Sequence, residues 1–160
     1  MVNRAWGNEY RTTMVCIGAY HGGEFSGRFY NPYLGTGQEF ENLMQFLQEI
    51  DQTLDVMDFP KSFTATRTFA PAPKPRAGVA RMEEQTGKIA TFALRILFRQ
   101  NASWQGSITW QEGGMEQSFR SALELLFLMD NALRQTTEEY QNGDNGVPHY
   151  HALELEHDKT

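Results

Sequence analysis

The sequence has a single cysteine, Cys16, so no disulfide can form within the chain. Its N-terminal segment, residues 1–13, is polar and does not resemble a secretory signal peptide. Because structural disulfides belong to oxidising compartments, these two absences lead us to expect a reducing, cytoplasmic setting.

Long apolar runs are also missing. The longest uninterrupted one covers residues 125–129, whereas a membrane-spanning helix needs about 20 residues. We therefore expect no transmembrane segment and no membrane partner.

Basic residues are outnumbered, because 14 Lys and Arg stand against 20 Asp and Glu and give a formal net charge of -6. Nucleic-acid binding depends on Lys and Arg that displace phosphate counterions, so this balance disfavours a nucleic-acid partner. The charge is unevenly distributed, however. Residues 61–88 carry six basic and two acidic side chains, whereas residues 112–160 carry three basic and ten acidic ones and end in an acidic tail, residues 141–160.

What the sequence does contain is an internal match, which appears when the chain is shifted by 79 residues without a gap. The helical part of the match includes two aspartates, Asp51 and Asp130. Other matched pairs are Gly27 and Gly106, Gly35 and Gly114, Phe40 and Phe119, Met44 and Leu123, Ile50 and Met129, and Leu54 and Leu133. One offset over about forty residues indicates two copies of a unit, repeat 1 at about 12–55 and repeat 2 at about 90–134.

Each copy is predicted to run strand, turn, strand, loop, helix. Strand candidates cover residues 12–20, 24–31, 90–99 and 104–111. Thr36 and Glu39 fit a capping box at the start of the first helix. A further strand is predicted at 62–69, within the proline-rich basic segment 61–88 that joins the copies.

These elements predict one α+β domain over residues 1–160. The expected architecture is a duplicated β-β-α unit that forms one mostly antiparallel sheet with two helices on one face.

Alternation along the strands assigns the side chains to two faces of the sheet. The inner face of the second copy takes Phe92, Leu94, Ile96, Phe98, Trp104, Ile108 and Trp110, and its outer face is polar. In the first copy the outer face is not polar, and it supplies the candidate binding residues Met14, Cys16, Tyr20, Arg28 and Tyr30. Arg95 and Arg99 join them from the second copy. Either the tail or the proline-rich loop covers this patch, or a protein partner binds it.

The second helix is apolar most of the way round. Leu125, Phe127 and Leu128 stand where the first helix has Phe46, Gln48 and Glu49. This helix either lies centrally beneath the first helix and the tail, or forms a dimerisation surface.

Catalytic signatures are scarce. Cys16 and His21 are close in sequence, but nothing orients the imidazole, so a packing role for Cys16 is favoured. Residues 34–37 could bind an anion at a helix start, although the matched glycines Gly35 and Gly114 favour a shared turn.

Two sets of residues have the chemistry of metal ligands. Asp51 and Asp130 could share a proton or a metal, but such residues more often pair locally. The tail carries His149, His151 and His157, which a solvated acidic tail would also contain. We predict no catalytic residue, no metal site and no cofactor.

Three segments, GRFYNPY at 27–33, LFRQNASWQG at 97–106 and SFRS at 118–121, resemble those of a family of small uncharacterised bacterial proteins. The similarity covers most of the chain outside the tail. The resemblance implies no activity, cofactor or catalytic residue, because the family has none assigned.

The sequence therefore favours a non-enzymatic protein-binding or self-associating module, such as a homodimer, that uses the outer face of the first hairpin and the second helix. The alternative is a nucleic-acid or nucleotide binder that uses the same sheet face with Arg95 and Arg99. A small metal-dependent enzyme is the third hypothesis.

Overall fold

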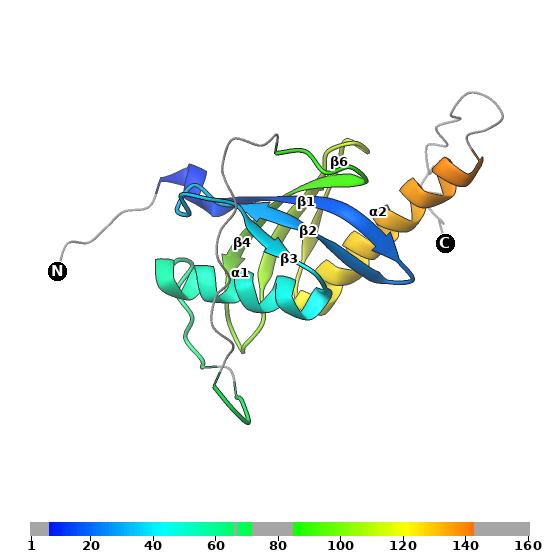
Figure 1. The fold of residues 1–160 in the computed structure, drawn as a ribbon. Helices are drawn as coiled ribbons and strands as arrows, with labels where there is room; N and C mark the ends of the chain where they lie inside the picture. Colours follow the sequence, from blue (N-terminus) through cyan, green and yellow to red (C-terminus); the bar gives the residue numbers. More distant parts are fainter. Residues whose placement is uncertain (1–6, 66, 72–84, 143–160) are drawn as a thin grey trace, which may run out of the picture.

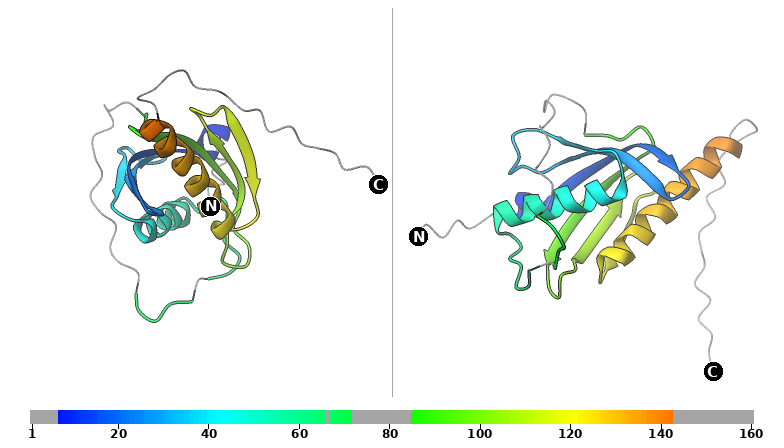
Figure 2. Two further views of the ribbon diagram at one scale, coloured as in Figure 1. Left: turned by 90° about the vertical axis from the view of Figure 1, so that its right-hand side faces the viewer. Right: turned by 60° about the horizontal axis from the view of Figure 1, so that its bottom comes forward.

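The computed structural model describes residues 7–65, 67–71 and 85–142, which form an α+β fold. A 3-10 helix, η1 (Asn8–Arg11), precedes β1 (Thr12–His21), β2 (Glu24–Tyr30), β3 (Gln38–Phe40) and α1 (Leu43–Met57). The same order follows in β4 (Ala90–Phe98), β5 (Gln105–Trp110), β6 (Met115–Phe119) and α2 (Ala122–Asn142). In this described part of the chain, six strands form one antiparallel sheet in the order β3-β2-β1-β4-β5-β6, with both helices on one side (Figures 1 and 2). The predicted fold class is confirmed.

The two halves of the sheet meet at β1 and β4, in a register that agrees with the 79-residue offset. Met14 lies directly opposite Ala93, its own equivalent in the other half. The flanking pairs of the ladder are Thr12–Arg95, Thr13–Leu94, Val15–Phe92 and Cys16–Thr91. Under the offset, each flanking pair maps onto the pair at the same distance on the other side of Met14–Ala93. The ladder therefore has the symmetry of a two-fold axis through this pair, which is compatible with the predicted duplication.

A β-bulge interrupts the ladder at equivalent positions in both halves. The register shifts between Ile17 and Ala19 where β1 pairs with β2, and between Ile96 and Phe98 where β4 pairs with β5. An extra residue in one strand reverses the alternation of side chains beyond it. Residues after each bulge therefore face the side opposite to the one that simple alternation predicts.

Glycine is required opposite each bulge. An ideal Cβ at Gly27 would lie 2.0 Å from the carbonyl oxygen of Cys16, and one at Gly106 would lie 1.8 Å from that of Arg95. Any larger residue would push the two strands apart, so the matched glycines have a backbone role that is the same in both halves.

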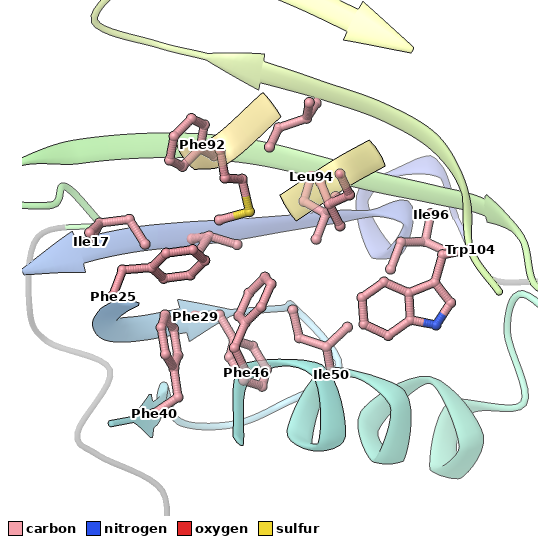
Figure 3. Close-up of a cluster of buried hydrophobic side chains, with 14 of the residues drawn as sticks. Ile17, Phe25, Phe29, Phe40, Phe46, Ile50, Phe92, Leu94, Ile96 and Trp104 are labelled. Carbon is pink, nitrogen blue, oxygen red and sulfur yellow. The ribbon is translucent and has the colours of Figure 1, made fainter. Parts of the chain in front are cut away.

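The inner sheet face and the two helices enclose the core (Figure 3). Phe25, Phe40 and Phe46 form an aromatic cluster with ring centroids 5.0–6.2 Å apart. The fully buried residues of α2 are Leu125, Met129 and Leu133. These side chains lie under the second half of the sheet, because α2 packs against β4, β5 and β6 while α1 packs against β2 and β3. Both helices therefore lie in one layer, and α2 does not lie beneath α1 as one of the two alternatives from the sequence had it.

The helices begin with capping boxes at equivalent positions. Asn42 Oδ1 accepts a hydrogen bond from the Gln45 N–H (2.9 Å), and Gln45 Oε1 accepts one from the Glu41 N–H (2.8 Å). At α2, Ser121 Oγ accepts from the Glu124 N–H at 3.1 Å. Each box satisfies donors that have no partner in the first helical turn.

Two predicted features are wrong. The box of Thr36 and Glu39 does not exist, because Gln38–Phe40 is strand β3 and the helix starts at Leu43. The strand predicted at 62–69 is absent from the described residues there, where Ser62 makes only an isolated parallel bridge with Arg99. Each half is consequently β-β-β-α, with a third strand that the sequence did not indicate.

Candidate functional site

Five of the seven predicted binding residues lie together on the outer face of the sheet. In the ladders, Met14 lies opposite Tyr30, and Cys16 lies opposite Arg28. Arg95 lies opposite Thr12, two residues along β1 from Met14, and therefore shares this face.

Much of this outer face is covered by other parts of the chain. Only 2% of Cys16 and 4% of Tyr30 are exposed. The loop at 31–37 covers the Tyr30 ring, since an ideal Cβ at Gly37 would lie 2.4 Å from its Cε1.

Residues 85–89, at the end of the central segment, cross the sheet next to Cys16. The Ile89 N–H donates to the Ile17 carbonyl (3.0 Å), and the Gly87 N–H donates to Thr91 Oγ1 (2.9 Å). The patch is therefore partly covered by the chain itself, although by residues 85–89 rather than by the proline-rich loop, most of which lies outside the described residues. The predicted tail contribution lies outside the described residues.

Small hollows remain beside the covering segments. A hollow of about 260 Å³ contacts Met14 and Tyr30, and one of about 300 Å³ contacts Cys16 and Arg28. Both volumes are at or below the lower end of the range of about 300–1,000 Å³ that is usual for small-molecule pockets.

Cys16 has no features of a nucleophile. Burial raises the pKa of its thiol to about 11, an effect that nearby Arg28 partly offsets and Glu112 increases. A neutral thiol reacts slowly. His21 stands five residues further along β1, about 16 Å away, so the hypothetical Cys16–His21 pair does not form.

The other two predicted residues, Tyr20 and Arg99, are on the inner side of the sheet, which corrects their assignment to the outer face. Both follow a bulge, and both contact the helix of the other half. The Tyr20 hydroxyl donates to Asp130 Oδ1 in α2 at 2.5 Å. Phe98, which was assigned to the inner face, is exposed for the same reason.

Arg99 forms the most extensive polar contact between the halves. Its buried guanidinium donates from Nη1 to Asp55 Oδ1 (2.6 Å) and from Nε to the Pro60 carbonyl (2.7 Å). Nη1 also lies 3.5 Å from Asp51 Oδ1, which accepts a hydrogen bond from Trp104 Nε1 at 3.2 Å. In Figure 3, Trp104 lies beside α1.

These two contacts are equivalent under the 79-residue offset. Tyr20 corresponds to Arg99, and Asp130 corresponds to Asp51. We call the two contacts the polar locks. The matched aspartates therefore serve separate locks rather than a shared site, and within the described residues no three His, Cys, Asp or Glu side chains are grouped as a metal site requires.

Burial raises the pKa of Tyr20, and its hydrogen bond to Asp130 raises it further. The tyrosine is therefore a neutral donor to the carboxylate at neutral pH. Such a donor fits a structural role.

Residues 34–37 do not precede a helix, because β3 follows them, so the anion site suggested for a helix start is wrong. The histidines of the tail, His149, His151 and His157, lie outside the described residues.

The helix α2 presents an apolar surface to solvent. Phe127 is 63% exposed and Leu123 is 60% exposed, whereas Leu125 is buried and Leu128 is partly buried against the core. We call Leu123 and Phe127 the α2 patch. The sequence marked Phe127 as surplus but gave Leu123 only as the match of Met44, and such a match carries no information on exposure.

Two ion pairs border the α2 patch. Arg120 Nη2 lies 2.9 Å from Glu124 Oε2, and Arg134 Nε lies 3.0 Å from Asp130 Oδ2. Both pairs join residues four apart, so the charges beside the patch are balanced locally.

Comparison with family models, curated proteins and solved structures found no match to this chain. In the described residues, no helix is both long enough and apolar enough to cross a membrane.

Proposed function

We propose that this protein is a non-enzymatic self-associating module in which two copies pair through α2. The observation that supports this most strongly is the exposure of the α2 patch, Leu123 and Phe127, whose side chains lie one helical turn apart on one face. Burial of a Leu or Phe side chain contributes about 1.5–3 kcal/mol, and a symmetric contact counts each residue twice.

The α2 patch fits a second copy of itself. In an antiparallel approach about a two-fold axis at the level of Leu125, Leu123 of each copy would contact Phe127 of the other. The same approach would place Arg120 opposite Asp130 of the second copy. Arg120 and Asp130 each already have an ion-pair partner on their own helix, so a second copy is favoured mainly by the self-complementary spacing of Leu123 and Phe127.

The outer face of the first hairpin is less suited to this role. Its central side chains, Cys16 and Tyr30, are already buried within the chain. A platform for nucleic-acid bases would also need Tyr20 and Arg99, which lie on the other side of the sheet.

The test is sedimentation equilibrium of the natural chain and of Phe127→Gln at about 1–500 μM. The substitution copies Gln48, the equivalent residue of α1, so a helix of this fold accommodates it. We expect the natural chain to dimerise and the variant to raise the dissociation constant at least tenfold, since two rings leave the interface and about 1.4 kcal/mol is a factor of ten.

Met44→Gln is the matched control. Met44 is 61% exposed and occupies on α1 the position of Leu123 on α2, so its substitution should leave the dissociation constant unchanged. A natural chain that stays monomeric at 500 μM would contradict the proposal, as would equal effects of the two variants. A different protein bound at the α2 patch would also leave the isolated chain monomeric.

A further inference from the structure

The contacts that hold the two halves of the chain together are reciprocal. The β1–β4 ladder is symmetric about the Met14–Ala93 pair. The polar locks continue this symmetry, because the first strand of each half contacts the helix of the other half. Such a contact has the geometry of an isologous dimer interface, in which the same surface appears on both sides.

A second copy of the chain could supply either side of this interface without any change in the contacts. If the first half of one copy paired with the second half of another, the same ladder pairs and both locks would form. The α2 patch takes no part in these contacts, since Leu123 and Phe127 face solvent.

We infer that two copies of this chain can exchange halves, so that the interface between β1 and β4 forms between chains instead of within one. Closed monomer and exchanged dimer share their contacts, so the balance depends mainly on concentration. Linked segments experience effective concentrations on the order of 1 mM. Refolding at about 1 mM should therefore populate the exchanged dimer, and refolding at about 1 μM should not.

The test uses two chains that each carry one cysteine, in a background of Cys16→Ala and Phe127→Gln. One chain carries Met14→Cys and the other carries Ala93→Cys. Directly opposed residues of an antiparallel ladder have Cα atoms about 4.5–5.5 Å apart, a separation that a disulfide spans. In closed monomers the two cysteines never meet at the axis, whereas in an exchanged dimer they face each other.

The chains are mixed in denaturant, refolded together at about 1 mM, diluted and oxidised. We expect a disulfide-linked heterodimer on a non-reducing gel, at least fivefold more abundant than for Met14→Cys mixed with Ser118→Cys. Ser118 is exposed on β6, away from the axis. Chains refolded separately and then mixed should give no more product than this control.

Equal yields from the axis pair and the control pair would overturn the inference. If the cysteine variants fail to refold, the same comparison is made by mass on the Phe127→Gln chain after refolding at about 1 mM and 1 μM. A dimer that persists after dilution supports exchange, and a monomer under both conditions rejects it. Because this background lacks the Phe127 ring, failure of exchange is distinguishable from failure of the proposed α2 contact.

Discussion

At the scale of single residues, Arg99 shows how a buried cation joins parts of the chain that are distant in sequence. It extends from the end of β4 to two carboxylates of α1 and to the Pro60 carbonyl beyond that helix. The guanidinium is buried, whereas the two carboxylates are partly solvated. Loss of the contact would therefore leave an unpaired buried charge on Arg99 but only solvated charges on the aspartates.

Arg99→Met should lower the free energy of unfolding by about 3 kcal/mol, because it removes the charged hydrogen bonds and leaves the Pro60 carbonyl without its donor. Urea unfolding followed by circular dichroism measures the change. Arg120→Met, at an exposed ion pair, is the control and should have little effect. Similar losses in the two variants would show that the lock does not stabilise the fold.

Cys16 should make stability depend on alkaline pH. Its thiol pKa is raised from 9.0 to about 11. Below pH 9 the thiol is neutral in the folded and unfolded states, so this contribution to stability is fully present there. Between pH 9 and 11 only the unfolded thiol ionises, which lowers the free energy of unfolding as the pH rises.

Cys16→Ala should therefore flatten the fall in stability over this range, as measured by urea unfolding at pH 8, 9, 10 and 11. Part of the fall should remain above pH 10, because the pKa of Tyr20 is raised as well. Parallel pH profiles of the natural chain and Cys16→Ala would contradict the assignment.

Strand alternation predicted the outer position of Met14, Cys16, Arg28, Tyr30 and Arg95 correctly. It failed for Tyr20 and Arg99 because both lie beyond a bulge, and one extra residue reverses the alternation. The matched glycines opposite the bulges were visible in the sequence. Their spacing indicated a repeat, but it did not reveal which backbone they approach.

At the scale of elements, the two bulges depend on glycine in the neighbouring strand. Gly106→Ala should destabilise the fold by about 3 kcal/mol or more, because its Cβ would meet the Arg95 carbonyl oxygen at 1.8 Å. Gly35→Ala is the control, since no atom lies within 4 Å of its ideal Cβ. Thermal unfolding of both variants provides the comparison, and equal melting temperatures would contradict the role assigned to Gly106.

The pattern of the sequence located four strands and both helices but missed β3 and β6. β3 has three residues, of which only Phe40 is buried, so it leaves almost no alternation to detect. β6 has four exposed residues before Phe119, as an edge strand at the sheet surface can have. The segment at 62–69 has the alternation of a strand, yet Phe63 and Phe69 are exposed. An alternating sequence therefore does not form a strand where no other part of the chain buries its apolar side chains.

At the scale of the whole molecule, a side chain from the sheet of each half forms a polar contact with the helix of the other half. The two locks use different residues at equivalent positions. Arg99 of the sheet contacts Asp51 and Asp55 of α1, whereas Tyr20 contacts Asp130, which pairs with Arg134 on its own helix. Arg134 is the equivalent of Asp55. The positively charged residue therefore follows a strand in one lock, as Arg99, and lies on the helix in the other, as Arg134.

A double-mutant cycle with Tyr20→Arg and Arg134→Asp tests this reciprocity most directly, because together the two changes rebuild the Arg99 lock around Asp130. Each single variant places like charges together and should lose stability. The double variant should recover part of that loss, with a coupling energy of about 1–2 kcal/mol in urea unfolding. Additive effects of the two substitutions would contradict the account, since they would mean that residue 20 of the first half does not face α2 of the second.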